Sequence, residues 1–258
     1  MFLINRVQRP PLNAVLFQPT AGVHATPDMA GLEYVDLDIT TSDGVVLHGW
    51  WIPTSRPRIG HVLFAHGNGG NIGDRILHAQ LLSEAGFDVL LFDYRGYGSS
   101  AGRPSERGTY LDSRAARTAL LAQDGVAGGR TFYLGESLGG GVVLELALAH
   151  PPAGVILTST FSSVRDVARE HFAILPSFLV PDAYPNARRI AELQAPVLIQ
   201  HGAVDDLVPV EQAHRNYAAA AGQKELQVID NAGHNDLVVL AGREWVTAIT
   251  SWSSRLSM

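Results

Sequence analysis

Residues 135–139 read GESLG, so a serine has a glycine two positions away on each side. The apolar run 131–134 before it predicts a buried strand, and the apolar run 142–148 after it predicts a helix. A serine at such a strand-to-helix turn is typical of a nucleophile elbow, in which a strained backbone exposes the hydroxyl group and glycines let strand and helix approach closely. Ser137 is therefore the candidate nucleophile. The alternative is a glycine-rich turn in which Ser137 only caps the helix.

Strands and helices alternate along the chain on both sides of this turn. The predicted strands are 35–39, 45–52, 62–65, 89–92, 131–135, 154–158, 197–200 and 225–229. The predicted helices are one that ends at Gly86 and those at about 105–124, 138–150, 210–221 and 236–254. Such alternation implies right-handed crossovers between parallel strands. The sequence predicts an α/β fold with a doubly wound, mostly parallel sheet of eight strands.

The first two predicted strands form an exception to the parallel order. Residues 42–44 read SDG, a hairpin signal, so antiparallel N-terminal strands are expected at one edge of the sheet. The chain has 258 residues, of which 46% are hydrophobic and 17% charged, which suits a large buried core. No linker or repeat divides the sequence. We expect residues 1–258 to form a single domain.

Composition excludes several classes of chemistry. The net charge of −6 argues against nucleic acid as a partner. The absence of cysteine removes disulfides, thiolate zinc sites and cysteine nucleophiles. No H-E-x-x-H motif or clustered acid and histidine spacing is present, so no metal and no cofactor are expected. The oligomeric state is not indicated by the sequence.

Membrane segments are not indicated either. No apolar run approaches the roughly 18 residues that span a bilayer, and the apolar block within 1–7 is too short for a signal peptide. A cytoplasmic location is expected. The stretch 10–19 contains Val15, Leu16 and Phe17, which either pack on the domain or touch a membrane surface peripherally.

Three chemically complementary residues follow strand ends, where open α/β sheets place their sites. Ser137 follows strand 131–135, Asp205 follows strand 197–200, and His234 follows strand 225–229. A serine hydroxyl needs a neighbouring base, and His234 would accept its proton and return it to the leaving group.

Asp205 would orient the histidine ring and stabilise its charged form. The adjacent Asp206 is the competing candidate, but the spacing H-G-x-x-D-x-x-V-P from His201 favours Asp205. An oxyanion hole needs two backbone N–H groups aimed at one point. Leu138 is expected to supply one and Asn68, in the glycine-rich segment 66–71, the other.

Taken together, these motifs resemble one known superfamily. The matching stretches are HGNGGN at 66–71, DYRGYGSS at 93–100, GESLGG at 135–140, PVLIQHG at 196–202 and Gly233-His234. Over roughly 35–254 the chain is similar to the α/β-hydrolase superfamily, most of all to small bud-emergence-type serine hydrolases and abhydrolase-domain proteins. The resemblance implies a serine hydrolase that works through a covalent acyl-enzyme, and it says little about the substrate. We expect an ester or thioester of a small to medium acyl group. Depalmitoylases of this branch carry an N-terminal cysteine cluster, which this chain lacks.

The family's lid usually lies in the interval that is 161–195 here. This short cap-like insertion predicts one or two short helices rather than a lid domain. Phe172, Leu175 and Phe178 either line the substrate pocket or simply pack on the sheet.

Three other functions compete with that of a serine hydrolase. Gly67, Gly69 and Gly73 with Asp93 imitate a dinucleotide-binding turn, but the single lysine, Lys224, leaves no Tyr-x-x-x-Lys pair for such an oxidoreductase. An acyltransferase would use the same three residues. A non-catalytic binding protein on this fold is a further alternative.

Overall fold

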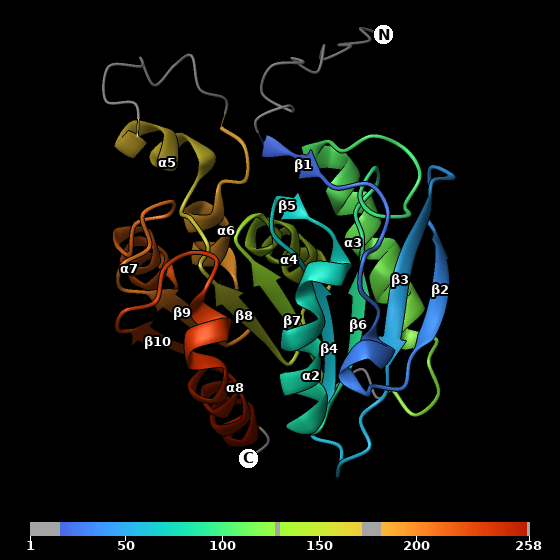
Figure 1. Ribbon diagram of the computed structural model, residues 1–258. Coiled ribbons are helices and arrows are strands. Elements are labelled where there is room, and N and C mark those ends of the chain that lie inside the picture. The colour runs from blue at the N-terminus through green and yellow to red at the C-terminus, as the bar shows by residue number, and fades with distance from the viewer. Residues whose placement is uncertain (1–15, 127–129, 172–181, 257–258) are drawn as a thin grey trace, which may run out of the picture.

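The computed structural model describes residues 16–126, 130–171 and 182–256, and its centre is a sheet of eight strands (Figure 1). Their spatial order is β10-β9-β8-β7-β4-β6-β3-β2. The strands are β2 (Val35–Thr40), β3 (Val46–Ile52), β4 (Gly60–Ala65), β6 (Phe87–Phe92), β7 (Thr131–Glu136), β8 (Gly154–Thr158), β9 (Val197–Gly202) and β10 (Lys224–Ile229). The prediction of eight strands is confirmed.

The direction of the strands also agrees with the sequence. The six strands from β10 to β6 pair in parallel, whereas β3 runs antiparallel to both β2 and β6. The mostly parallel α/β fold is therefore confirmed, and the antiparallel hairpin forms one edge of the sheet. Strands β4, β6 and β7 are buried along their whole length, which explains their unbroken apolar sequences.

Helices cover both faces of the sheet. They are α2 (Ile76–Glu84), α3 (Glu106–Leu121), α4 (Leu138–Ala149), α5 (Val164–His171), α6 (Asn186–Glu192), α7 (Glu211–Ala219) and α8 (Leu237–Arg255). Buried side chains of α2 and α8 form one apolar core with one face, and those of α3, α4, α6 and α7 form a second core with the other. Each face of the sheet thus has its own layer of helices, as a parallel sheet requires.

A small second sheet lies at the end where the parallel strands finish. Strand β1 (Gln18–Pro19) pairs in parallel with β5 (Gly69–Gly70). The backbone N–H of Gln18 donates to the Asn68 carbonyl at 3.0 Å. The sequence predicts only a glycine-rich loop at 66–71, so the pairing of β1 with β5 is a feature that the sequence analysis did not predict. It fixes the N-terminal segment beside the predicted oxyanion loop (Figure 1).

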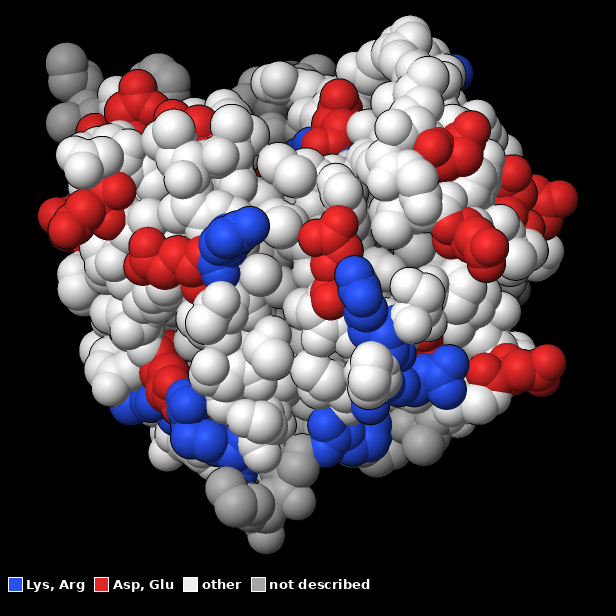
Figure 2. Space-filling model, turned by 60° about the horizontal axis from the view of Figure 1, so that its bottom comes forward, with Lys and Arg blue, Asp and Glu red and all other residues white. Residues whose placement is uncertain are grey.

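The surface near the opposite end of the molecule carries charges of both signs. Figure 2 shows Lys and Arg side chains in the lower half of that face, with acidic side chains and uncharged surface between them. The exposed Arg255–Glu225 ion pair, with a 2.6 Å separation, is an example of such mixed charge. Within the described ranges, no helix combines the length and the apolar character needed to cross a membrane.

Candidate active site

Ser137 occupies the turn between β7 and α4 in a strained conformation. Its φ is 50° and its ψ is −114°, a region that non-glycine residues rarely adopt. A Cβ at Gly135 would lie 2.5 Å from the backbone of Gly139 and Gly140, so only glycine permits this close approach of strand and helix. The Ser137 N–H donates to the Thr158 carbonyl at 2.9 Å, which ties the turn to strand β8.

The three predicted side chains come together in one hydrogen-bonded row. Nε2 of His234 lies 3.1 Å from Oγ of Ser137, and Nδ1 of the same ring lies 2.7 Å from Oδ2 of Asp205. They are brought from positions as far as 97 residues apart in sequence. The Asp205 side chain is fully buried, and only 7% of the His234 side chain is exposed. Such burial strengthens the electrostatic interaction between the carboxylate and the ring.

The loop after β9 folds around the Asp205 carboxylate. Oδ1 accepts the backbone N–H of Leu207 at 3.0 Å and of Val208 at 2.7 Å, and Nε2 of His201 lies 3.3 Å from Oδ2. Burial alone would raise the pKa of Asp205, but the hydrogen bonds from His201 and His234 and the Val208 N–H outweigh burial and hold it well below its ordinary value. Asp205 is therefore an anion. The competing Asp206 is exposed and contacts neither ring.

An apolar cavity of about 570 Å³ opens at Ser137. Asn68 and Leu138, the two residues predicted for the oxyanion hole, both line it beside the serine. Most of the remaining wall is apolar and includes Phe161, Val164, Val167, Leu207 and Val208. A mostly apolar cavity with a few polar groups at one end is typical of small-molecule sites.

The cap-like insertion contributes to this cavity through α5. Phe161, Val164, Val167, Ala168 and His171 all line the cavity. The predicted pocket residues Phe172, Leu175 and Phe178 lie outside the described residues. The apolar side chains of α5 were not predicted as pocket residues, although their three- and four-residue spacing is the signal of a helix face.

A buried charged cluster lies on the other side of the serine. Nε of Arg75 donates to Oε2 of Glu136 at 2.5 Å, and Nε2 of His78 lies 3.9 Å from the same oxygen. Burial favours a raised pKa for Glu136, but the Arg75 guanidinium lowers it overall, so the carboxylate is ionised. Burial lowers the pKa of His78 to about 4, so its ring is neutral. The sequence gives no signal for this cluster.

The remaining strand-end histidines have structural partners. Nδ1 of His66 lies 2.8 Å from the Gly67 carbonyl, and Nε2 of His201 lies 2.7 Å from the Val208 carbonyl, so each holds its own loop. Asp93 is the residue that would bind a ribose if the chain held a dinucleotide. It is completely buried and accepts the Ile72 N–H at 3.0 Å, so its carboxylate does not face a ribose site. In the part of the chain that the structure describes, no three His, Asp or Glu side chains are grouped as metal ligands would be.

The strand order, the flanking helices and the strained serine at the turn between β7 and α4 are together those of an α/β-hydrolase, and comparisons with known proteins agree. Residues 56–187 match the model of the hydrolase family described as Serine aminopeptidase, S33 (Hydrolase_4). The chain belongs to this family. The relatives include the uncharacterized protein Rv2307c of Mycobacterium tuberculosis, which is 43% identical over 218 residues, covering 83% of this chain and 77% of the relative. The uncharacterized protein YfhR of Salmonella typhi is 33% identical over 256 residues, covering 92% and 84%.

Solved structures show the same fold. The esterase Pf2001 of Pyrococcus furiosus superposes with a TM-score of 0.77 at 23% identity, over 93% of this chain and 98% of that one. The esterase domain of a Rhodothermus marinus protein gives a TM-score of 0.67 at 20% identity, over 87% and 99%. The family and the fold together make this protein a hydrolase.

Proposed function

We propose that this hydrolase cleaves an ester or thioester of a small to medium acyl group through a covalent acyl-enzyme. The observation that carries the proposal is the row Ser137–His234–Asp205, with its distances of 3.1 and 2.7 Å, whose serine lines an apolar cavity. The esterase names of two similar solved structures agree with an ester substrate.

The proposed chemistry follows from these contacts. With its Nδ1 proton donated to Asp205, the His234 ring presents Nε2 as the acceptor for the Ser137 proton. The serine oxygen attacks the acyl carbon, and the charge that develops on the carbonyl oxygen is stabilised by the N–H groups of Asn68 and Leu138. His234 then gives its proton to the departing alcohol or thiol, which leaves the acyl group on Ser137.

Hydrolysis of the acyl-enzyme repeats the same proton transfers with water. His234 takes a proton from water, the resulting hydroxide attacks the acyl carbon, and the proton passes to the Ser137 oxygen as the acid is released. The apolar wall of the cavity supports an apolar acyl chain, since each buried methylene contributes about 0.8 kcal/mol to binding.

A fluorophosphonate probe tests the proposal directly. The probe should phosphonylate the wild-type protein once, and peptide mass spectrometry should locate the adduct on Ser137. Labelling should vanish in Ser137→Ala and fall strongly in His234→Ala, because the ring activates the hydroxyl. A folded wild-type protein that takes no label, or takes it elsewhere, would refute the acyl-enzyme mechanism.

A further inference from the structure

A second cavity lies on the opposite side of the Ser137–His234 pair. It has a volume of about 250 Å³ and lies between α2 and the start of α8, and we call it the side cavity. His234 forms part of its wall, whereas Ser137 and Asn68 line the apolar cavity. Among the described residues, the two cavities share no lining residue. The serine thus faces one cavity, and the histidine that exchanges protons with it faces the other.

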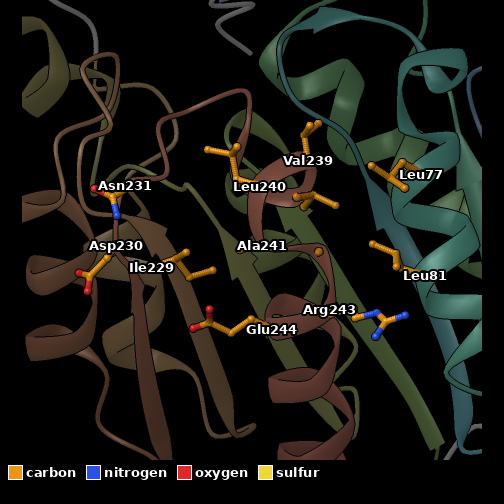
Figure 3. Close-up of a pocket in the computed structure, with 12 residues that line it drawn as sticks. Leu77, Leu81, Ile229, Asp230, Asn231, Val239, Leu240, Ala241, Arg243 and Glu244 are labelled. Atoms are coloured by element: carbon orange, nitrogen blue, oxygen red, sulfur yellow. The ribbon is translucent and has the colours of Figure 1, made fainter.

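The side cavity opens to solvent through an apolar mouth. Leu77 of α2 and Val239 of α8 line both the side cavity and the larger outer hollow of about 680 Å³. Figure 3 shows Leu77 and Leu81 pointing from α2 toward α8, with Val239 on the facing helix. Val239 is 70% exposed and Leu77 is 40% exposed, so neither side chain closes the opening.

The inner wall is polar but nearly neutral. The Arg75 guanidinium and the Glu136 carboxylate neutralise each other, and the His78 ring is uncharged because burial lowers its pKa to about 4. In the described part of the chain, neither Nη group of Arg75 has a hydrogen-bond acceptor. Asp74 is at the exposed rim, where its carboxylate accepts the Asn71 N–H. Such a wall can form hydrogen bonds with the hydroxyl groups of a ligand. It has no net charge that would offset the cost of burying a charged ligand.

The position of Arg75 connects this wall to the reacting serine. A Cβ built on Gly67 would lie 3.4 Å from Nη2 of Arg75 and 3.5 Å from Cβ of Ser137, so these two atoms are within about 7 Å of each other. The alcohol that leaves the ester and the water that attacks the acyl-enzyme both exchange a proton with Nε2 of His234. The alcohol and the water must therefore lie on the side of Ser137 opposite the acyl chain.

We propose that the side cavity is the alcohol subsite, which takes a small, polar, uncharged leaving group and admits the water that releases the acid. This inference rests on the proposed serine hydrolase. The volume lies below the roughly 300 Å³ at which pockets for drug-sized ligands begin, so the alcohol is small. The preferred substrate then combines an apolar acyl chain with an alcohol that carries further hydroxyl groups.

Three butyrate esters with different alcohols test the subsite. Glycerol monobutyrate has a polar neutral alcohol, hexyl butyrate an apolar one, and butyrylcholine a cationic one, while the acyl group is the same. Wild type should hydrolyse glycerol monobutyrate with the highest kcat/KM. Val239→Trp narrows the mouth and should lower that value about tenfold, because a glyceryl group kept out of the side cavity loses its hydrogen bond to a charged group, Arg75. Leu240→Trp is the matched control, because the adjacent Leu240 is 61% exposed and lines the outer hollow but not the side cavity.

Burst kinetics with p-nitrophenyl butyrate separate this inference from the proposed function. Val239→Trp should keep a burst of one p-nitrophenol per site, because this activated ester acylates Ser137 faster than water releases the acid even when its leaving group is not held in the side cavity. The steady state should be slower, because water entry is hindered. A normal burst with Val239→Trp and Leu240→Trp behaving alike, or a wild-type preference for hexyl butyrate or butyrylcholine, would overturn the alcohol subsite. The absence of any burst and of any fluorophosphonate label in wild type would overturn the acyl-enzyme mechanism instead.

Discussion

The Asp205 carboxylate lies 2.7 Å from Nδ1 of His234 and receives two further backbone N–H bonds from its own loop. These contacts fix the carboxylate before any substrate arrives. They also set Asp205 apart from Asp206, which is exposed although it is the next residue in the chain.

The two aspartates give the first prediction. Asp205→Asn should lower kcat by about 10⁴, because an amide at this position favours the wrong tautomer of His234. Asp206→Asn, the matched control, should change kcat less than about twofold, since exposed substitutions away from the site have small effects. The measurement is ester turnover at neutral pH. The reverse order would mean that the loop presents Asp206 in solution.

Removal of the nucleophile gives the second prediction. Ser137→Ala should lower kcat on p-nitrophenyl butyrate by a factor on the order of 10⁶, leaving only the contribution of binding and the oxyanion hole. Ser159→Ala serves as a control, because Ser159 is also buried and also has a positive φ, of 52°. If Ser137→Ala retained a tenth of the wild-type activity, the serine mechanism would be wrong.

The acid limb of the pH–rate profile gives the third prediction. The serine must give up a proton to a base in this mechanism, so kcat/KM should be lower in acid than at neutral pH. Because the pKa of Asp205 is held well below its ordinary value, Asp205 stays charged throughout this limb. A plot of log(kcat/KM) against pH should therefore rise with a slope of about one, for a single proton. A slope of two would show that a second group titrates with the base.

Stability should depend on pH through His78. Burial lowers its pKa from 6.5 to about 4, so between these values the unfolded chain binds more protons than the folded one. Stability is then lost as the pH falls from 6.5 toward 4, by roughly 2 kcal/mol between pH 7 and pH 4.5. Urea titrations should show this loss in wild type and a smaller loss in His78→Gln. The exposed His214→Gln should keep the wild-type dependence.

The apolar cavity gives the last prediction. With p-nitrophenyl esters, kcat/KM should climb over the first few acyl carbons and then fall, without a jump when the substrate passes its solubility limit. Val167→Trp fills part of the cavity and should move the optimum to a shorter chain. Arg169→Trp, on the exposed side of α5, should leave the optimum unchanged. A rate jump on insoluble long-chain esters would contradict the prediction that the insertion 161–195 is too short to act as a lid.

The strands could be predicted because each one has a local signal in the sequence. Residues 62–65 and 89–92 are unbroken apolar runs, and both lie in strands whose residues are all buried. The row of Ser137, Asp205 and His234 follows from the rule that strand ends share one edge of the sheet, although its catalytic role stays a prediction.

Other features depend on contacts that no local pattern encodes. Arg75 and Glu136 are 61 residues apart, and neither lies in a motif that requires the other. Strands β1 and β5 have two residues each, too few for any periodicity. Helix α5 has eight residues, so its apolar face spans barely two turns. Physical proximity in the folded chain, rather than sequence pattern, defines these parts of the site.

The pairing of β1 with β5 has a practical consequence for handling the protein. Leu16 and Gln18 form part of the cavity wall, so this part of the N-terminal segment lies at the site. The last described residues, at the end of α8, lie at the opposite end of the molecule (Figure 1). An affinity tag or fluorescent fusion joined near Leu16 would compete with substrate for the entrance. The same tag attached after α8 would leave the entrance open, so C-terminal fusions are the ones to use for immobilised enzyme assays.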